Sequence, residues 1–258
     1  MRLPFVISVP HASFAIPEDI KPSIALTARE TIESCDFGAR EIFTQLPVSV
    51  TLWARWSRLV VDLNRDPAER GSYGVVPEFD YHGRRIYKEN YFPTEEEVDR
   101  RLKKYYWPYH HRLKEAMQSP QIKALFDCHS LAKIGPPAAP DTLRWRKDIV
   151  LGNGGDLFGE IDPARGMTTC PAETLHMTKK IFCRSGFSVS INRPYSGGFI
   201  TTHYGTLFAG EGKMTIQIKI NHTLYLDEVT LQLRMDKLTP LVKRLQHVFR
   251  EMGKEWCS

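Results

Sequence analysis

The chain has 258 residues, of which 42% are hydrophobic and 25% charged. These fractions are typical of an ordinary globular protein, and the length suits one α/β domain over residues 1–258. No apolar run approaches the roughly 18 residues of a membrane-spanning helix. Residues 1–11 lack the length and the small-residue cleavage site of a signal peptide. We therefore expect neither a membrane anchor nor a secretory leader.

The cysteine pattern bears on the cellular compartment of the protein, and the net charge bears on the class of its binding partner. The chain has five cysteines, an odd number, and none of them forms a CxxC pair. This pattern favours reduced thiols and a cytoplasmic protein. The formal net charge of +5 attracts anions. Small anionic substrates explain this charge as well as nucleic acid does.

Short runs rich in Val, Ile and Leu predict the strands. They show little alternation of polar and apolar residues, which is typical of strands buried on both faces of a parallel sheet. In chain order the expected strands are residues 4–9, 48–53, 58–67, 122–130, 148–155, 186–191 and 214–220.

Helical spacing separates these strands. The expected helices are residues 27–46, which include Asp36, then 94–117, 171–185 and 239–252. Basic and aromatic residues alternate in the second helix, but its apolar residues lie on one stripe, which favours an amphipathic helix over a nucleic-acid site. Residues 66–93 show no period, and a loop of this length is usually a lid or a binding loop. The pattern predicts a mixed, mostly parallel sheet flanked by helices.

Two of the expected strands end in a histidine. His129 ends the strand at 122–130, with Asp127 two residues earlier on the same face, and His11 follows the first strand. Ligands of open α/β sheets bind beyond the carboxyl ends of the strands. Two imidazoles and the Asp36 carboxylate would make a catalytic zinc set with an open position, and Asp127 could orient an imidazole. The alternative is a pair of core histidines bonded to backbone carbonyls.

Two arginines are candidates for binding a substrate carboxylate. Arg58 and Arg65 lie at the two ends of one expected strand. The planar guanidinium binds both oxygens of a carboxylate, although a solvated surface charge is the alternative for each. Gly197 and Gly198 would permit a close approach of the backbone to a ligand.

Several blocks of the chain resemble the N-formylglutamate amidohydrolase family. The blocks are Ser-Val-Pro-His at 8–11, Ser-Arg-Leu-Val-Val-Asp-Leu-Asn-Arg-Asp-Pro at 57–67, Asp-Cys-His-Ser at 127–130, Asn192 with Pro-Tyr-Ser-Gly-Gly at 194–198, and Leu-Tyr-Leu-Asp-Glu at 224–228. They occur in the family's order. The resemblance implies a single-domain, zinc-carboxypeptidase-like α/β hydrolase fold, distantly similar also to aspartoacylase, with one Zn²⁺.

The resemblance also implies roles for individual residues. The metal ligands would be His11, Asp36 and His129, although Phe14 occupies the position where carboxypeptidases have a glutamate ligand. The substrate-binding residues would be Arg58, Asn64, Arg65, Asn192, Tyr195, Gly197 and Gly198. His203 is a further catalytic candidate. The implied reaction is hydrolysis of N-formyl-L-glutamate, or of a similar N-acyl acidic amino acid, to formate and glutamate. The implied partner is this small molecule, with no nucleic acid and no membrane.

One position departs from the family's pattern. The chain reads Gln-Ile-Lys-Ile-Asn-His at 217–222, where the family resembles Gln-Ile-Glu-Ile-Asn-Arg. The resemblance makes that glutamate the general base, and Lys219 cannot accept a proton while it is charged. Lys219 acting as a base with a lowered pKa is one outcome. A catalytically impaired relative that binds an acidic ligand or a protein partner is the alternative, and a structural lysine turned to solvent is the third.

Overall fold

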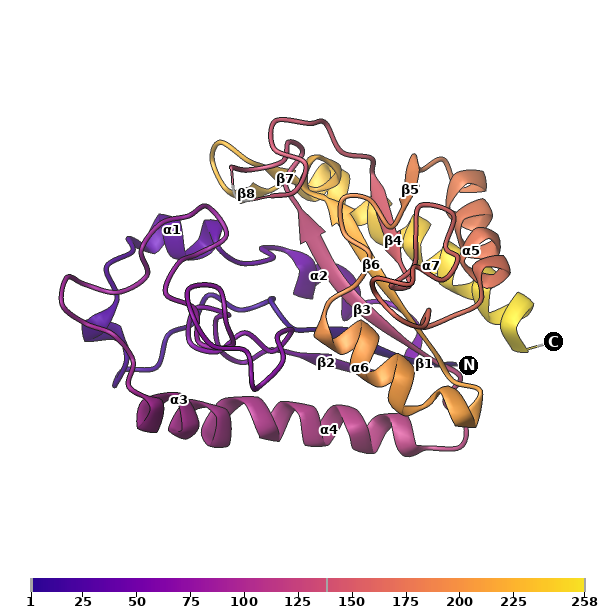
Figure 1. Cartoon of the computed structure of the whole chain (residues 1–258). Helices are drawn as coiled ribbons and strands as arrows, with labels where there is room; N and C mark the ends of the chain where they lie inside the picture. The colour runs from indigo at the N-terminus through magenta and orange to yellow at the C-terminus, as the bar shows by residue number, and fades with distance from the viewer. Residues whose placement is uncertain (1, 138, 258) are drawn as a thin grey trace.

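A six-stranded sheet forms the centre of the protein (Figure 1). The computed structural model describes residues 2–137 and 139–257; Met1, Ala138 and Ser258 lie outside the described residues. The strands are β1 (Leu3–Val9), β2 (Val48–Trp53), β3 (Ala124–Leu131), β4 (Ile149–Gly152), β5 (Val189–Ile191) and β6 (Met214–Asn221). Their order across the sheet is β2-β1-β3-β6-β4-β5.

The ladders confirm the predicted mixed, mostly parallel sheet. β1 pairs in parallel with β2 and with β3, and β3 pairs in parallel with β6. β4 runs antiparallel to β6 and parallel to β5. The carboxyl ends of β1, β3 and β6 therefore meet at one edge of the sheet, where the predicted ligands lie.

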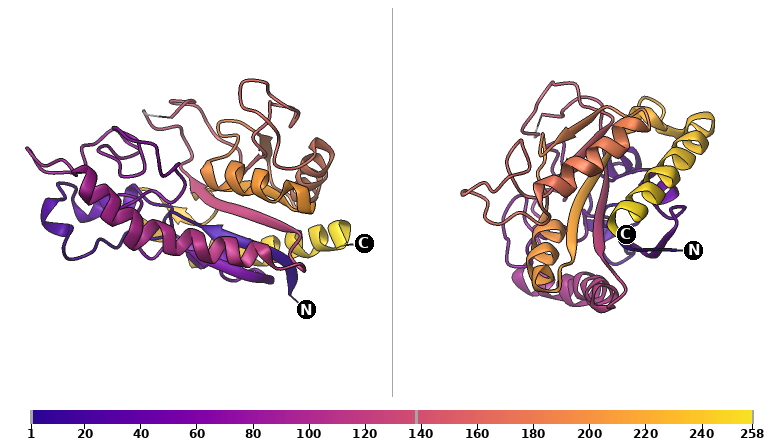
Figure 2. Two further views of the ribbon diagram at one scale, coloured as in Figure 1. Left: turned by 60° about the horizontal axis from the view of Figure 1, so that its bottom comes forward. Right: turned by 90° about the vertical axis from the view of Figure 1, so that its right-hand side faces the viewer.

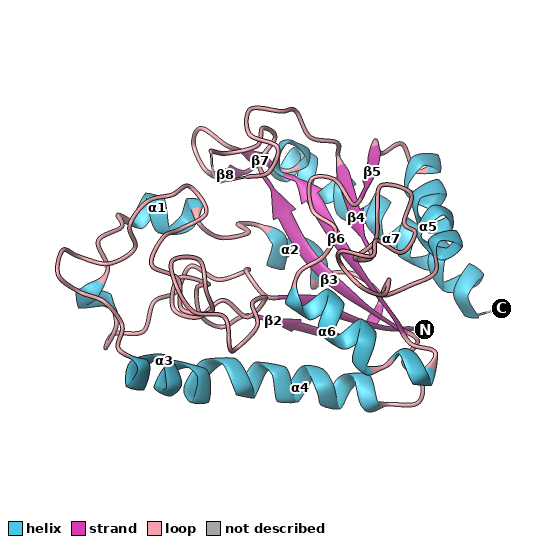
Figure 3. Ribbon diagram, in the orientation of Figure 1, coloured by secondary structure: helices cyan, strands magenta, loops and turns pink. Residues whose placement is uncertain are grey.

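Helices cover both faces of the sheet (Figure 3). The described α-helices are α1 (Ala28–Glu33), which lies away from the sheet, α2 (Ala39–Phe43), α3 (Glu95–Arg101), α4 (Trp107–Gln118), α5 (Ala172–Arg184), α6 (Phe199–Leu207) and α7 (Met235–Cys257). A π-helical segment, Leu102–Tyr106, joins α3 to α4. A second, two-stranded sheet pairs β7 (Leu226–Asp227) with β8 (Gln232–Leu233). No helix in the described ranges is long and apolar enough to cross a membrane.

The alternation of side chains along β3 divides the core into two layers. The helices on the two sides of the sheet can be followed in Figure 2. Phe126 and Cys128 pack with residues of α2, α5 and α7. Leu125 packs on the other face with residues of α4 and α6. Every residue of β3 is buried, as the continuous apolar run predicted.

The predicted helix over 27–46 is wrong in one respect that matters for the site. The chain forms α1 and α2 with a turn between them, and Asp36 lies in this turn. Gly38 adopts φ +82°, a left-handed conformation that ends helical continuity, and the Asp36 N–H donates to the His11 carbonyl at 2.9 Å. The break therefore fixes Asp36 beside the end of β1.

Two further predictions of secondary structure are corrected. Residues 58–67, all of them described, form turns instead of a strand, although Leu59, Val60 and Val61 are buried as predicted. The apolar run reflects burial against the loop at 75–87 and carries no information about hydrogen-bonded pairing. α7 begins at Met235, so Thr239-Pro240 lies inside the helix and not at its start. The sequence analysis did not predict α6.

The loop at 66–93 is confirmed as a long segment without a helix or strand of three or more residues, all of it within the described part of the chain. Isolated bridges hold it, including one between Phe79 and Arg85. Buried Val75, Ile86 and Tyr87 anchor it to the body of the protein. The loop is therefore packed and reaches the candidate site, as described below.

The turn that carries Asp36 can be tested with a pair of glycine substitutions. Gly38→Ala should destabilise the protein more than Gly83→Ala. Both glycines have a left-handed φ, which costs about 1–2 kcal/mol for alanine. A Cβ at Gly38 would also lie 2.5 Å from Tyr225 Cε2 and 2.7 Å from Leu233 Cδ2, whereas one at Gly83 meets no atom within 4 Å. Overpacking adds about 1–3 kcal/mol at Gly38 alone. Urea unfolding measures the difference, and equal losses would contradict this packing.

Candidate metal site and substrate cavity

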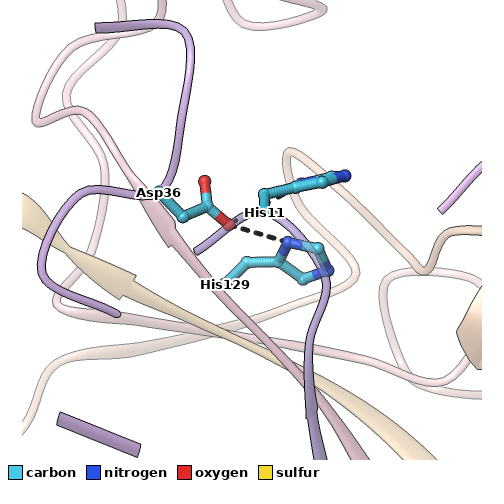
Figure 4. Close-up of side chains that lie close together, drawn as sticks. All are labelled: His11, Asp36 and His129. Carbon is cyan, nitrogen blue, oxygen red and sulfur yellow. Dashed lines mark hydrogen bonds and ion pairs between the residues drawn. The ribbon is translucent and has the colours of Figure 1, made fainter. Parts of the chain in front are cut away.

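The predicted ligands come together in one buried cluster (Figure 4). His11 follows β1, His129 belongs to β3, and Asp36 lies in the turn between α1 and α2. One ligand atom from each of these residues lies within 4.8 Å of the others, and all three residues are buried. Both imidazoles contact side-chain carboxylates, which differs from the alternative of a core histidine bonded to a backbone carbonyl.

Both imidazoles direct the same ring nitrogen toward Asp36. The Nδ1 atom of His129 lies 2.9 Å from Asp36 Oδ2, and the Nδ1 atom of His11 lies 3.7 Å from the same oxygen. The two rings are close, with centroids 4.8 Å apart. A cation between these atoms would receive two nitrogens and one oxygen from three separate parts of the chain.

A second carboxylate lies behind each imidazole. His11 Nε2 is 2.7 Å from Asp62 Oδ1, and His129 Nε2 is 2.9 Å from Asp127 Oδ1. Each Nε2–H can donate to its carboxylate, which leaves the Nδ1 lone pair available to a metal. This role was predicted for Asp127 but not for Asp62. The signal that could have identified Asp62 is a single aspartate, two residues before Asn64, among the apolar residues at 59–63.

The two imidazoles differ in protonation when no metal is bound: burial opposes the charged form of His129, but the charge of Asp127 and the hydrogen bonds to Asp127 and Asp36 outweigh it and raise its pKa. Burial lowers the pKa of His11 to about 4, and the nearby Arg58 cation adds to this effect. Burial opposes ionisation of Asp36, but the hydrogen bond and charge of His129 outweigh it and hold the pKa of Asp36 below its usual range. A neutral imidazole and an ionised carboxylate are the forms that coordinate metals. The donors present thus fit a divalent metal ion with an open position.

Asp127 also connects the site to its surroundings. Its Oδ2 accepts hydrogen bonds from Asn64 Nδ2 at 3.2 Å, Thr201 Oγ1 at 2.9 Å and Gln217 Nε2 at 3.0 Å. Asn64 in turn accepts the Ile200 N–H at 2.7 Å. The buried carboxylate is fully bonded, so its position and that of His129 are well determined.

A cavity of about 520 Å³ opens from this cluster. It brings together most of the predicted site residues, which are His11, Asp36, Arg58, Asn64, Arg65, Tyr195, Gly197, Gly198 and Lys219. Gly198 is required by close packing, because a Cβ there would lie 2.5 Å from Asn64 Nδ2. Gly198 thus lets the chain pass directly beside Asn64, whereas a close approach of the backbone to a ligand stays a prediction.

The two arginines of the cavity are not equivalent. Arg58 Nη2 bonds Asp62 Oδ2 at 2.6 Å, so part of its charge is already neutralised. Arg65 makes one longer contact, 3.4 Å from its Nη1 to Glu69 Oε1, and its side chain is 41% exposed. Arg65 is therefore the arginine with more free donors for a ligand.

Two predicted site residues lie elsewhere. Asn192 is buried and binds Asn153, accepting its N–H at 3.0 Å and donating to its Oδ1 at 2.9 Å, so it supports the loop after β4. His203 is exposed on α6, where its ring stacks on Phe199 with centroids 4.7 Å apart. Neither residue lines the cavity. The sequence blocks identified the right loops but not which side chains face inward.

Lys219 faces the cavity and not the solvent. β6 places it opposite His129 in the parallel ladder, and its Nζ lies 4.8 Å from the centroid of the Tyr195 ring. Burial lowers the pKa of Lys219 to about 8, and the Asp36 and Asp127 carboxylates limit the fall. The interpretation of Lys219 as a lysine turned to solvent is therefore wrong.

Other residues of the cavity were not found from the sequence. Tyr81 comes from the loop at 66–93, and its hydroxyl bonds that of Tyr195. Arg146 donates from Nη2 to both phenols, at 3.2 Å to Tyr81 and 3.3 Å to Tyr195. Further lining residues include Glu33, His82, Ser130, His222 and Glu228. A hydrogen-bond chain of this kind has no local sequence signal, because its members are tens of residues apart.

Comparisons with known proteins agree with this description. Residues 3–226 match the family model described as N-formylglutamate amidohydrolase. The chain is 27% identical to an N-formylglutamate deformylase of Pseudomonas aeruginosa, over 88% of this chain and 84% of that protein. It is 26% identical to one of Pseudomonas putida, over 88% and 83%. The crystal structure of N-formylglutamate amidohydrolase from Ralstonia eutropha JMP134 superposes with TM-score 0.76 and 22% identity, covering 99% of this chain and 94% of that one.

The carboxylate behind His11 can be tested directly. Asp62→Asn should weaken Zn²⁺ binding about 10–100-fold, because an amide orients the imidazole less well and lowers its basicity. Competition with a chromophoric chelator measures the affinity. Asp148→Asn is the matched control, since Asp148 bonds Ser188 and no histidine. Equal Zn²⁺ affinity in Asp62→Asn and the natural protein would contradict the proposed support.

Proposed function

The chain belongs to the N-formylglutamate amidohydrolase family, and we propose on this basis that it is a zinc-dependent amidohydrolase of N-formyl-L-glutamate or a similar N-acyl acidic amino acid. The observation that carries the proposal is the buried cluster of His11, Asp36 and His129 at the end of a cavity lined by cationic side chains. The products would be formate and glutamate.

The cluster fits a zinc ion. His11, Asp36 and His129 would hold it, and the metal's contribution would be Lewis-acid polarisation of the substrate's acyl carbonyl. Asp62 and Asp127 keep both imidazoles in one tautomer and one orientation. Asn64, bonded to Asp127 and to the N-terminus of α6, fixes the cavity wall next to these ligands.

The charges of the cavity suit a dianionic substrate. N-formylglutamate carries two carboxylates, and the cavity presents Arg58, Arg65 and Lys219. We propose that Arg65 binds a carboxylate through its free donors and that Arg58 contributes the donors that Asp62 leaves open. Tyr195 and the backbone at Gly197 and Gly198 would form the opposite wall.

The protonation state of Lys219 decides whether this residue can accept a proton from the attacking water. Burial lowers the pKa of Lys219 to about 8, and only its neutral form can accept a proton from the attacking water. The charged form of Lys219 favours a second function, which is the binding of an acidic ligand. A cavity with three cationic side chains can retain an acidic ligand without hydrolysing it, as in a catalytically impaired relative.

We also propose that residues 1–258 act as one domain in the cytoplasm. The ground for the location is the odd cysteine number without CxxC spacing. The described cysteines Cys35, Cys128, Cys170 and Cys183 are free thiols.

Formate release from N-formyl-L-glutamate tests the function. The zinc-loaded natural protein should release formate, and Lys219→Glu should release it faster, by about 10²–10⁴-fold, if a carboxylate is the better base at this position. Turnover by the variant alone would favour the impaired relative. Retained ligand binding without formate from either protein would contradict the deformylase function.

The carboxylate role of Arg65 has its own test. Arg65→Ala should weaken binding of N-formyl-L-glutamate by at least about tenfold, which corresponds to about 1.4 kcal/mol for a lost charged hydrogen bond. Zn²⁺ content should not change. Arg70→Ala is the control, because Arg70 belongs to the same loop but pairs with Glu95 outside the cavity lining. Calorimetry gives the affinities, and equal values for the two variants would remove the role from Arg65.

A further inference from the structure

A second group of interacting side chains lies in the same cavity, apart from the metal ligands. Ser130 Oγ is 2.8 Å from His222 Nε2, and His222 Nδ1 is 3.3 Å from Glu228 Oε1. All three residues line the cavity. A hydroxyl, an imidazole and a carboxylate in this order are the arrangement that activates a serine nucleophile in acyl-transfer enzymes.

The three residues come from different elements. Ser130 is next to His129 in β3, and adjacent residues of a strand point to opposite faces, so Ser130 is directed away from the His129 side. His222 begins a 3₁₀ turn, His222–Leu224, directly after β6. Glu228 follows β7. The serine thus reaches the cavity by a different face of the sheet from the metal cluster.

The surroundings fix the geometry of the group. Asn221 caps the turn, its Oδ1 accepting the Thr223 N–H at 3.1 Å. Glu228 Oε1 also accepts the Lys133 N–H at 3.0 Å. The neighbouring Tyr225 hydroxyl donates to the Phe37 carbonyl at 2.9 Å, so its own proton is not available to Ser130.

The contact with Glu228 favours one tautomer of His222. A carboxylate can only accept a proton, so Glu228, 3.3 Å from Nδ1, stabilises the neutral tautomer that carries its hydrogen on Nδ1. In that tautomer Nε2 is the acceptor and Ser130 is the donor in their hydrogen bond. This is the protonation state in which the imidazole can remove the serine proton.

We propose that Ser130, His222 and Glu228 form a second catalytic group that transfers acyl groups through a covalent Ser130 ester. Ser130 Oγ would form a bond to the carbonyl carbon of an ester or activated amide while its proton passes to His222 Nε2. The bond to the leaving alcohol or amine breaks, and that group takes the proton from His222. A water molecule, deprotonated by His222, then attacks the carbonyl carbon of the Ser130 ester; the bond to Ser130 Oγ breaks, Oγ takes the proton back from His222, and the carboxylic acid is released.

This chemistry is independent of the amidohydrolase proposal. It uses no ligand of the candidate metal site, and its substrate class is small acyl esters that fit a cavity of about 520 Å³. The competing explanation is structural: the Ser130–His222 bond would only hold the segment after β6 against β3. If the bond were only structural, His222 would not have to accept the Ser130 proton, and Ser130 would not react with acyl esters.

The test is covalent labelling by p-nitrophenyl acetate, with and without chelator. The natural protein should release a stoichiometric burst of p-nitrophenolate, and peptide mass spectrometry should find the acetyl group on Ser130 in both samples. Ser130→Ala should lose the burst and the adduct. His222→Asn should slow acylation about 10²–10⁴-fold, as expected for loss of a general base. His247→Asn, an exposed histidine on α7, should match the natural protein.

Glu228 needs a separate measurement because it acts through His222. Glu228→Gln should slow acylation by at least about tenfold, and Glu228→Asp should restore part of the rate, since a carboxylate again fixes the tautomer. Thermal unfolding identifies any variant that is merely misfolded. No adduct on natural Ser130, an adduct on another residue, or an unchanged acylation rate in His222→Asn would each overturn the proposal.

Discussion

The bonding of the Asp127 carboxylate is the constraint on which the site depends. This group is completely buried in the central strand, where an unpaired charge would be very unfavourable. Donors from His129, Asn64, Thr201 and Gln217 surround it and come from the strand itself, the segment after β2, α6 and β6. The same bonds that make a buried charge tolerable orient His129 toward Asp36. Stability and function therefore share one network.

The central strand also explains how one edge of the sheet presents two kinds of chemistry. Side chains alternate along β3, so His129 joins His11 and Asp36 on one side, and Ser130 meets His222 on the other. Both reach one cavity because the sheet ends there and the loops after β6 and at 66–93 enclose the space. A metal-dependent and a serine-dependent acyl transfer would then act on ligands held by the same cationic wall.

Lys219 adds a third cationic side chain to this cavity, beside Arg58 and Arg65. Its position opposite His129 follows from the β3–β6 register, and the Tyr195 ring and the Asp36 and Asp127 carboxylates surround its half-buried side chain. Tyr195 is itself tied to Tyr81 and Arg146, so the loop at 66–93 and the loop before β4 define the wall that the lysine contacts. The cavity thus carries three cationic side chains, Arg58, Arg65 and Lys219, beside three carboxylates, Glu33, Asp36 and Glu228.

The sequence by itself determined the sheet, the strands that end in His11 and His129, and the family blocks, because burial and local conformation depend on short patterns. It also placed Arg58, Asn64, Arg65, Gly197 and Gly198 in one site. Only the tertiary structure showed that residues 58–67 are turns, that Asn192 and His203 lie outside the cavity, and that Asp62 supports His11. It also brought Ser130, His222 and Glu228 together. Contacts between residues separated by tens of positions depend on how the elements pack, and no local pattern records that packing.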